Sequence, residues 1–257
     1  MLAHAGKKKN CIKNVIANFL IVILLGITCY CGYKLIPDFV NSSKASKEMG
    51  TVADIVQKSN ESNDQKFSKA SFDALKAENA DLIGYLEFDS EIINLPIMQA
   101  SDNDYYLRKS FYKNYNEQGI PFMDSECNLE SKNITIYGHN VYYDDSAMFS
   151  PISFLVNQEN FEESQTFRIY FKNEIRYYQI TDVYVVDINE GFDFKQQYFE
   201  DEETFEKWYS TIQSRNLISA NDRLQYEDNF VTLQTCKRYS TDSRIVVIGK
   251  EISRVSY

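Results

Sequence analysis

The chain has 257 residues, with 27 Lys and Arg against 37 Asp and Glu, and 44% of its residues are hydrophobic. This composition is typical of a folded chain of one or two domains and excludes wholesale disorder. The net charge of -10 argues against nucleic acid as a partner, because phosphate binding requires clustered Lys and Arg. Only two of the five cysteines, Cys127 and Cys236, lie beyond residue 36, which excludes a disulfide framework.

The N-terminal segment has the pattern of a membrane anchor. Residues 1–36 carry five lysines and no acidic residue, and residues 15–33 contain no charge. A helix of that length crosses a hydrocarbon core of about 30 Å. The basic residues at 7–13 predict a cytoplasmic N-terminus and an extracellular remainder. We therefore expect a cytoplasmic basic tail (1–14), a transmembrane anchor (15–36) and, outside the membrane, a helical lead (37–80) followed by a folded domain (81–257).

Two other N-terminal signals are alternatives to this anchor. A cleaved signal peptide has a shorter apolar region followed by a small-residue site of the A-x-A kind, and no such site follows here. A lipoprotein signal would place the modified cysteine at Cys29 or Cys31. The preceding Gly26-Ile27-Thr28 is a poor match to the small residues such a signal requires.

The remainder of the chain reads as strands with a few helices. Residues 41–58 and 67–79 have helical spacing, and a polar stretch at 59–65 separates them. Six runs rich in Val, Ile, Tyr, Phe and Thr have strand character. They cover residues 82–88, 134–137, 166–171, 175–186, 229–236 and 244–252.

One helix interrupts the strands, at residues 201–214. Its apolar residues fall on one face, and acidic residues occupy its first turn, where the helix dipole favours them. The pattern predicts a mostly β domain, a closed barrel or a sandwich, with helices added at its N-terminus and before the last strands.

Histidine usage limits the chemistry of the outer domain. His139 is the only histidine beyond the N-terminal His4, so a site built from several histidines is excluded. A Cys–His pair remains, with Cys127 or Cys236 as the thiol. Cys127 follows acidic residues in a loop, which oppose thiolate formation, and it reads as structural.

Cys236 is the better nucleophile. It ends an apolar strand and precedes a polar loop in which Lys237 and Arg238 would favour the thiolate. Arg244 opens the next strand, from which its guanidinium would stabilise an oxyanion. The residues alone also allow a simpler interpretation, in which Cys236 is a small buried hydrophobe and His139 a turn residue.

Several motifs together resemble those of class B sortases. Thr232-Leu-Gln-Thr-Cys236 matches the TLxTC motif that carries the sortase nucleophile, and Arg244 stands at the place of the family's arginine. Ile136-Tyr-Gly-His-Asn140 resembles the segment that carries the catalytic histidine. The segments at 95–107 and 119–124 are also similar to class B, and the likeness covers residues 70–252.

The resemblance implies an eight-stranded β-barrel with N-terminal helices and a long helix before the nucleophile strand. It implies a membrane-anchored cysteine transpeptidase. Cys236 would attack the Thr carbonyl of a C-terminal sorting signal of the N-P-x-T-N or N-P-x-T-G kind. An amine of the peptidoglycan stem or cross-bridge would resolve the thioacyl enzyme. Arg244 would bind the oxyanion, and His139 would transfer protons to and from the amines.

The same resemblance implies the substrate contacts and partners. Asn103, Leu107 and Tyr137 align with positions that line the signal-binding groove, although strand-edge and core packing explain them equally well. Gln234 and Lys237 flank the nucleophile and depart from the Ser and Glu of some relatives. The expected partners are surface proteins with a sorting signal, the peptidoglycan amine and the membrane. No metal and no other cofactor is implied.

Two other functions are compatible with these residues. A hydrolytic cysteine protease would use the same pair, with water as the acceptor, although papain-type enzymes have the cysteine before the histidine. A surface protein that binds through the same barrel without chemistry is the other alternative.

Overall fold

The computed structural model describes the backbone of residues 3–60 and 67–257, and the side chains of residues 16–33, 40, 43–60 and 67–257. The chain forms two compact units, residues 1–46 and 47–257. The helices are α1 (Ala3–Ser59), α2 (Lys69–Glu78), α3 (Gln158–Glu163) and α4 (Glu202–Gln213), with 3-10 turns η1 (Tyr105–Arg108), η2 (Pro151–Phe154) and η3 (Ile188–Glu190). The strands are β1 (Leu82–Phe88), β2 (Asn94–Met98), β3 (Phe122–Met123), β4 (Asn133–Tyr137), β5 (Thr166–Tyr170), β6 (Glu174–Asp187), β7 (Phe230–Cys236) and β8 (Ser243–Ser256).

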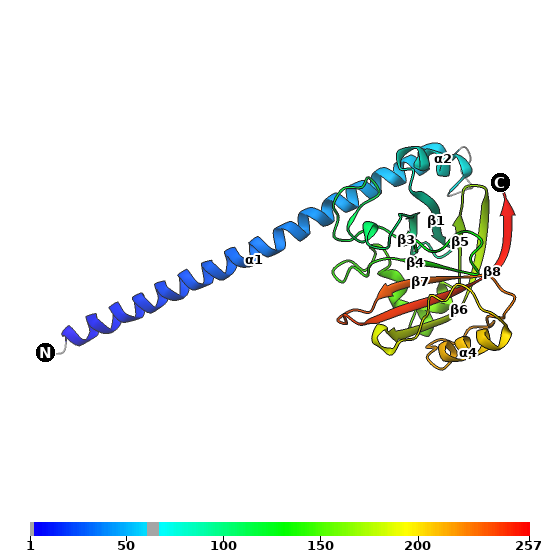
Figure 1. Ribbon diagram of the computed structural model, residues 1–257. Coiled ribbons are helices and arrows are strands. Elements are labelled where there is room, and N and C mark those ends of the chain that lie inside the picture. The colour runs from blue at the N-terminus through cyan, green and yellow to red at the C-terminus, as the bar shows by residue number, and fades with distance from the viewer. Residues whose placement is uncertain (1–2, 61–66) are drawn as a thin grey trace. The chain divides into compact units, whose positions relative to one another are not determined.

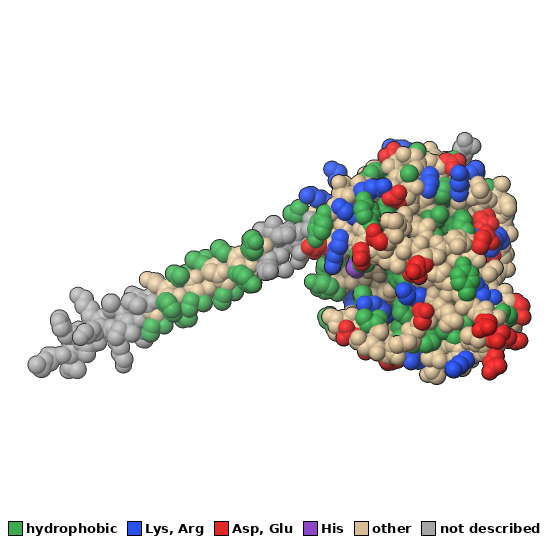
Figure 2. Space-filling model, in the orientation of Figure 1, with side chains coloured by type: hydrophobic (Ala, Val, Ile, Leu, Met, Phe, Trp, Pro, Cys, Tyr) green, Lys and Arg blue, Asp and Glu red, His purple; other side chains and the backbone are tan. Residues whose placement is uncertain are grey.

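The first unit contains most of α1. Its stretch Ile16–Tyr33 has a mean hydropathy of 2.0 over 18 residues, and none of these residues is buried against the protein. Figure 2 shows hydrophobic side chains along this part of the helix. The length and composition suit a membrane span, and a signal sequence has the same properties. The side chains of Lys7, Lys8, Lys9, Lys13 and Lys34 lie outside the described residues, as does the predicted break at 61–66.

The second unit is a closed barrel of eight strands in the order β1-β2-β3-β4-β7-β8-β6-β5 (Figure 1). Most neighbours are antiparallel, but β4 pairs with β7 in parallel, as does β2 with β3. A parallel pair requires a crossover, and the segment with α4 lies in the chain between β4 and β7. The predicted eight-stranded barrel is confirmed.

The alternation of side chains along the strands defines an inner and an outer face. Ile134 and Ile136 of β4, with Leu233 of β7, belong to the cluster of buried residues that fills the barrel. The other residues of β4 therefore point outward: Asn133, Thr135 and Tyr137. Every second residue of β7 and β8 also points outward. The outer face carries two further apolar clusters.

The helices of the second unit cover parts of this outer face. Phe72 and Leu75 of α2 are buried in one outer cluster, and Ser68 caps the helix by accepting from the Ser71 N–H at 3.2 Å. The apolar face of α4 packs in the other cluster, beside outward residues of β6 and β8. Asp201 caps α4 through the Thr204 N–H at 2.8 Å. Both helices lie where the sequence predicts them.

Candidate active site

Cys236 lies at the end of β7, directly opposite Arg244 of β8. Residues directly opposite in an antiparallel pair project from the same face of the sheet. Leu233 points into the barrel, so Cys236, three residues on, points outward. The thiol is partly exposed and forms no disulfide. The strand thus holds a free thiol at the rim of the barrel, on its outer face.

His139 follows β4, the parallel neighbour of β7. Tyr137 pairs with Gln234, and the Gly138 N–H donates to the Gln234 carbonyl at 3.1 Å. His139 follows two residues beyond this pair, and its neighbour Asn140 contacts the Cys236 carbonyl. The strand register therefore pairs Cys236 with Arg244 and sets the end of β4, which His139 follows, beside the strand of Cys236.

Backbone contacts fix the His139 ring. Its Nε2 lies 3.0 Å from the Leu107 carbonyl oxygen. A carbonyl only accepts, so Nε2 carries the proton and Nδ1 of the neutral ring is the acceptor. Burial lowers the pKa of His139, and Arg108 lowers it further, while the bond to Leu107 raises it in part. The neutral form is therefore favoured near pH 7.

Gly138 and the segment 148–150 hold the backbone beside His139. The Phe149 N–H donates to the His139 carbonyl at 3.0 Å. A Cβ on Gly138 would come within 2.4 Å of the Phe149 ring. The glycine thus permits the close packing that fixes the direction of the chain into His139.

Asn140 connects the histidine segment to the nucleophile. Its Nδ2 donates to the Cys236 carbonyl at 2.9 Å, and its Oδ1 accepts from Arg238 Nε at 3.3 Å. Arg238 also forms an ion pair with Asp145 and lies 5.4 Å above the Phe154 ring. The sequence motifs do not single out Asn140, although its position next to His139, in the motif at 136–140, is a signal that could have found it.

The cations around Cys236 differ in what they contact. Arg238 is bound by Asp145, and Arg244 Nη1 donates to the Thr241 carbonyl at 2.8 Å and the Ser243 carbonyl at 3.2 Å. Among the residues that the structure describes, no hydrogen bond joins the Cys236 sulfur to His139 or Arg244. The Lys237 N–H donates to the Ser243 carbonyl at 2.9 Å, so it already has a partner within the hairpin.

A cleft of about 630 Å³ opens beside the nucleophile. Its lining comprises Asn140, Tyr142, Cys236, Lys237, Arg238, Tyr239, Ser240 and Thr241. The cleft therefore exposes the thiol, while the neutral imidazole of His139 and the guanidinium of Arg244 belong to the neighbouring strand ends and do not line it. This set suits nucleophilic acyl transfer.

A sortase-domain family model matches residues 88–252, more than half of the chain. This chain is a sortase. Sortase B of Staphylococcus aureus is 25% identical over 237 residues, 90% of this chain and 94% of that protein. Sortase B of Listeria monocytogenes is 26% identical over 185 residues, 70% of this chain and 73% of that protein.

Solved structures agree with these relatives. Clostridium perfringens sortase B is 30% identical with a TM-score of 0.65, over 71% of this sortase and all of that chain. Sortase B of B. anthracis is 25% identical with a TM-score of 0.72, over 84% of this sortase and 99% of that chain. The sortase belongs to class B, as its motifs predict. It is a cysteine transpeptidase of the family that anchors proteins to the cell wall.

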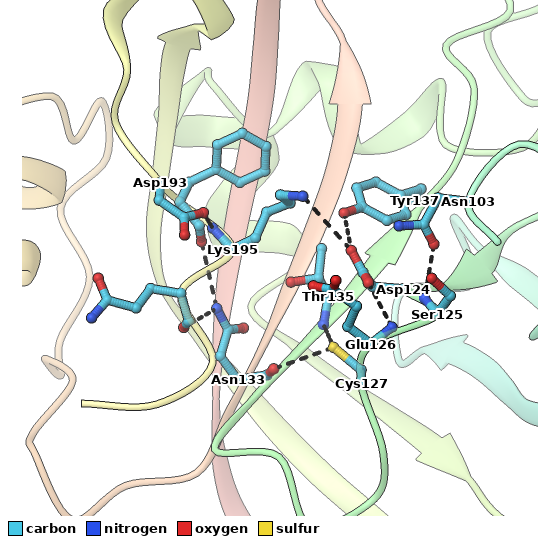
Figure 3. A network of polar contacts seen from close by, with 12 residues as sticks. Asn103, Asp124, Ser125, Glu126, Cys127, Asn133, Thr135, Tyr137, Asp193 and Lys195 are labelled. Carbon is cyan, nitrogen blue, oxygen red and sulfur yellow. Dashed lines mark hydrogen bonds and ion pairs between the residues drawn. The ribbon is translucent and has the colours of Figure 1, made fainter. Parts of the chain in front are cut away.

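The predicted substrate-binding residues lie on two sides of this site in the sortase. Tyr137 and Gln234 are register partners on the outer face. Each lies two residues before a catalytic candidate, Tyr137 before His139 and Gln234 before Cys236. Leu107 is partly buried in the cluster of α2, and its carbonyl holds His139. Asn103 accepts the Ser125 N–H at 2.8 Å (Figure 3). Lys237 is exposed at the cleft.

The second cysteine of the domain is structural. Cys127 is 4% exposed, and its sulfur accepts the Thr135 N–H at 3.4 Å (Figure 3). Burial, with Asp124 and Glu126 nearby, raises the pKa of Cys127 to about 11. A thiol held protonated and away from solvent is a poor nucleophile. Among the described residues, no group of three or more His, Cys, Asp or Glu side chains is arranged to hold a metal ion.

Proposed function

We propose that this sortase cleaves a C-terminal sorting signal of the N-P-x-T-N or N-P-x-T-G kind after its Thr. It then joins the surface protein to an amine of the peptidoglycan stem or cross-bridge. The observation that supports this most is the register, which pairs Cys236 with Arg244 and sets β4, the strand before His139, beside β7.

Acylation begins as the Cys236 sulfur attacks the carbonyl carbon of the signal Thr and loses its proton. The proton of the thiol passes to Nδ1 of His139, whose Nε2–H remains bonded to the Leu107 carbonyl. The Arg244 guanidinium stabilises the oxyanion of the tetrahedral intermediate. When the peptide bond after Thr breaks, His139 returns the proton to the leaving amine, and a thioester on Cys236 remains.

Transfer reverses these roles. The peptidoglycan amine attacks the thioester carbonyl, and His139 accepts the proton that this amine loses. The C–S bond then breaks, the new amide joins surface protein to cell wall, and the proton returns to the sulfur of Cys236. Splitting one acyl transfer into two steps lowers the barrier of each.

The sorting signal would lie along the outer face where Asn103, Leu107, Tyr137, Gln234 and Lys237 surround the ends of the strands. A solved Staphylococcus aureus sortase B–substrate complex shares this fold, with a TM-score of 0.70 at 23% identity. That likeness supports a substrate groove on the same barrel.

The proposal assigns the N-terminal part to the membrane. Residues 15–36 would be a single span with the basic tail 1–14 in the cytoplasm, and residues 37–80 would connect it to the extracellular barrel at 81–257. The apolar helix Ile16–Tyr33 supports this topology. Protease added outside intact cells should digest the barrel and spare an N-terminal tag; digestion of the tag instead would contradict it.

Product analysis tests the reaction. The full-length chain in detergent is mixed with a fluorescent sorting-signal peptide, with and without an amine that mimics a peptidoglycan stem. We expect peptide–amine conjugate when the amine is present. Hydrolysed peptide alone, at every amine concentration, would favour the hydrolytic protease. Peptide binding without any product would favour the barrel that only binds.

A further inference from the structure

Asp124 is a buried acid beside the proposed groove. Its side chain is 3% exposed, and it lies between β3 and β4. The Asp124 N–H donates to the Thr135 carbonyl at 2.9 Å, and its carbonyl accepts from Gln99 Nε2 at 2.9 Å. Its Oδ1 accepts the Glu126 N–H at 2.9 Å. These bonds fix the carboxylate so that Oδ2 faces Tyr137 and Lys195 (Figure 3).

The first partner of Oδ2 is the Tyr137 hydroxyl, which donates to it. Burial and Asp124 both raise the pKa of Tyr137 well above its usual value, so the hydroxyl remains a donor. The ring also packs against Phe122, with the centroids 5.2 Å apart. Tyr137 is the last residue of β4, two residues before His139, and it pairs with Gln234, two residues before Cys236. Asp124 therefore fixes a side chain at the strand end that leads into the candidate site.

The second partner of Oδ2 is the Lys195 ammonium, at 3.9 Å. Lys195 belongs to residues 188–201, which join β6 to α4 and are called here the β6–α4 connection. Asn133 of β4 holds the same connection, because its Nδ2 donates to the Gln196 carbonyl at 3.1 Å. The Trp208 Nε1 of α4 donates to the Asp193 carbonyl at 2.8 Å. The connection is therefore pinned against the outer face of β4.

We propose that Asp124 is a positioning residue that couples Tyr137 to the β6–α4 connection and thereby sets the shape of the groove for the sorting signal. Oδ2 of Asp124 accepts a hydrogen bond from the Tyr137 hydroxyl of β4 and forms an ion pair with the Lys195 ammonium of the β6–α4 connection. This assignment rests on the proposed function of the groove. Asp124 touches no reacting atom, so it acts on binding of the signal rather than on the thiol.

Asp124→Asn tests the role of the charge, because it keeps the shape and leaves an oxygen to accept from Tyr137. The KM for a sorting-signal peptide should rise about tenfold, as expected for loss of a charge-assisted bond. Lys195→Met should raise it less, about threefold, because its ion pair is partly exposed. Alkylation of Cys236 by iodoacetamide should keep its wild-type rate in both. Lys207→Met, on the exposed side of α4, is the matched control and should change neither quantity.

Hydrogen exchange of the full-length chain in detergent tests the same coupling without turnover. Exchange of residues 188–201 should rise in Asp124→Asn and in Lys195→Met, and remain at the wild-type level in Lys207→Met. Trp208 is the only tryptophan, so its emission should shift with the connection. Exchange that is unchanged in folded Asp124→Asn would overturn the proposal, whether or not the wild type processes the peptide.

The kinetic outcomes separate this proposal from the proposed function. If the wild type processes the peptide and Asp124→Asn leaves KM unchanged, the positioning role is wrong and the transpeptidase stands. If the KM of Asp124→Asn rises only together with slower alkylation of Cys236 and a lower melting temperature, Asp124 has a structural role alone. If the wild type forms no product, the transpeptidase assignment fails, and the exchange experiment still decides the coupling.

Discussion

Cys236 and Arg244 face each other as register partners at the loop end of the β7–β8 hairpin. The residues between them form a short loop, and Arg244 Nη1 donates back into that loop, to the Thr241 and Ser243 carbonyls. The guanidinium is thus oriented by the hairpin that also positions the thiol. This arrangement leaves the other donors of the guanidinium for an oxyanion next to Cys236.

Arg244→Lys keeps the charge but removes the planar set of donors. One ammonium cannot bond the loop carbonyls and an oxyanion with the same geometry. We expect kcat/KM to fall roughly 100-fold, comparable to the loss of one oxyanion donor. Peptide cleavage kinetics measure this. Arg254→Lys, on the same strand and away from the site, is the control; equal rates in both variants would contradict the role of Arg244.

Gly119 supports His139 indirectly. It has φ +58°, and a Cβ there would lie 2.6 Å from the Tyr106 carbonyl oxygen and 2.7 Å from that of Leu107, the acceptor of the His139 ring. Gly119→Ala should cost about 2 to 4 kcal/mol of unfolding free energy and reduce turnover of the folded fraction.

Gly191→Ala is the matched control for that change. Gly191 has φ +70° but open space where the Cβ would stand. Gly191→Ala should lower the free energy of unfolding by only about 1 kcal/mol, because of the left-handed backbone alone, and should leave turnover intact. Chemical denaturation and peptide cleavage give both quantities. An equal cost for the two variants would show that the contact with Leu107 is unimportant.

The lowered pKa of His139 makes stability depend on pH. Below about pH 6.5 the unfolded chain protonates this histidine before the folded chain does. Protons then favour unfolding, so the wild type loses stability as the pH falls from that value through the lower pKa of the folded state. His139→Gln should show a smaller loss over the same range. Urea unfolding at pH 5 to 7 measures both; parallel curves would contradict the burial of a neutral imidazole.

Asn140 should contribute to catalysis although it takes no part in proton transfer. Asn140→Ala removes the bond to the Cys236 carbonyl and the one from Arg238. We expect kcat/KM to fall about tenfold, as for loss of a partly buried bond, with the fold retained. Turnover and the melting temperature together check this. Wild-type turnover in Asn140→Ala would show that the end of β7 does not depend on that side chain.

The sequence predicts the long elements of the fold well. Strands such as β6 and β7 have continuous apolar and β-branched runs, and α4 has an apolar face with acidic residues at its start. It did not reveal β3, which has two residues, or β2, which contains Pro96. Such short strands exist through their neighbours, and local propensity carries no signal for them.

The residues of the candidate site also divide into those that the sequence identifies and those that only the folded structure reveals. Cys236, His139 and Arg244 stand in motifs, so the sequence selects them. The pairing of Cys236 with Arg244, and of β4 with β7, follows from the strand register. The contacts of Asn140 and Asp124 depend on residues far away in the chain, such as Arg238 and Lys195. No spacing pattern encodes these, because they arise only once the barrel closes.

Intact mass of the full-length chain after mixing with sorting-signal peptides of the N-P-x-T-N and N-P-x-T-G kinds tests the central claim most directly. The account predicts a mass increase equal to the peptide through its Thr, in the wild type and not in Cys236→Ala, with both proteins folded. No adduct with any of the peptides, from a folded chain whose Cys236 still reacts with iodoacetamide, would contradict it. An adduct that persists in Cys236→Ala would place the nucleophile elsewhere.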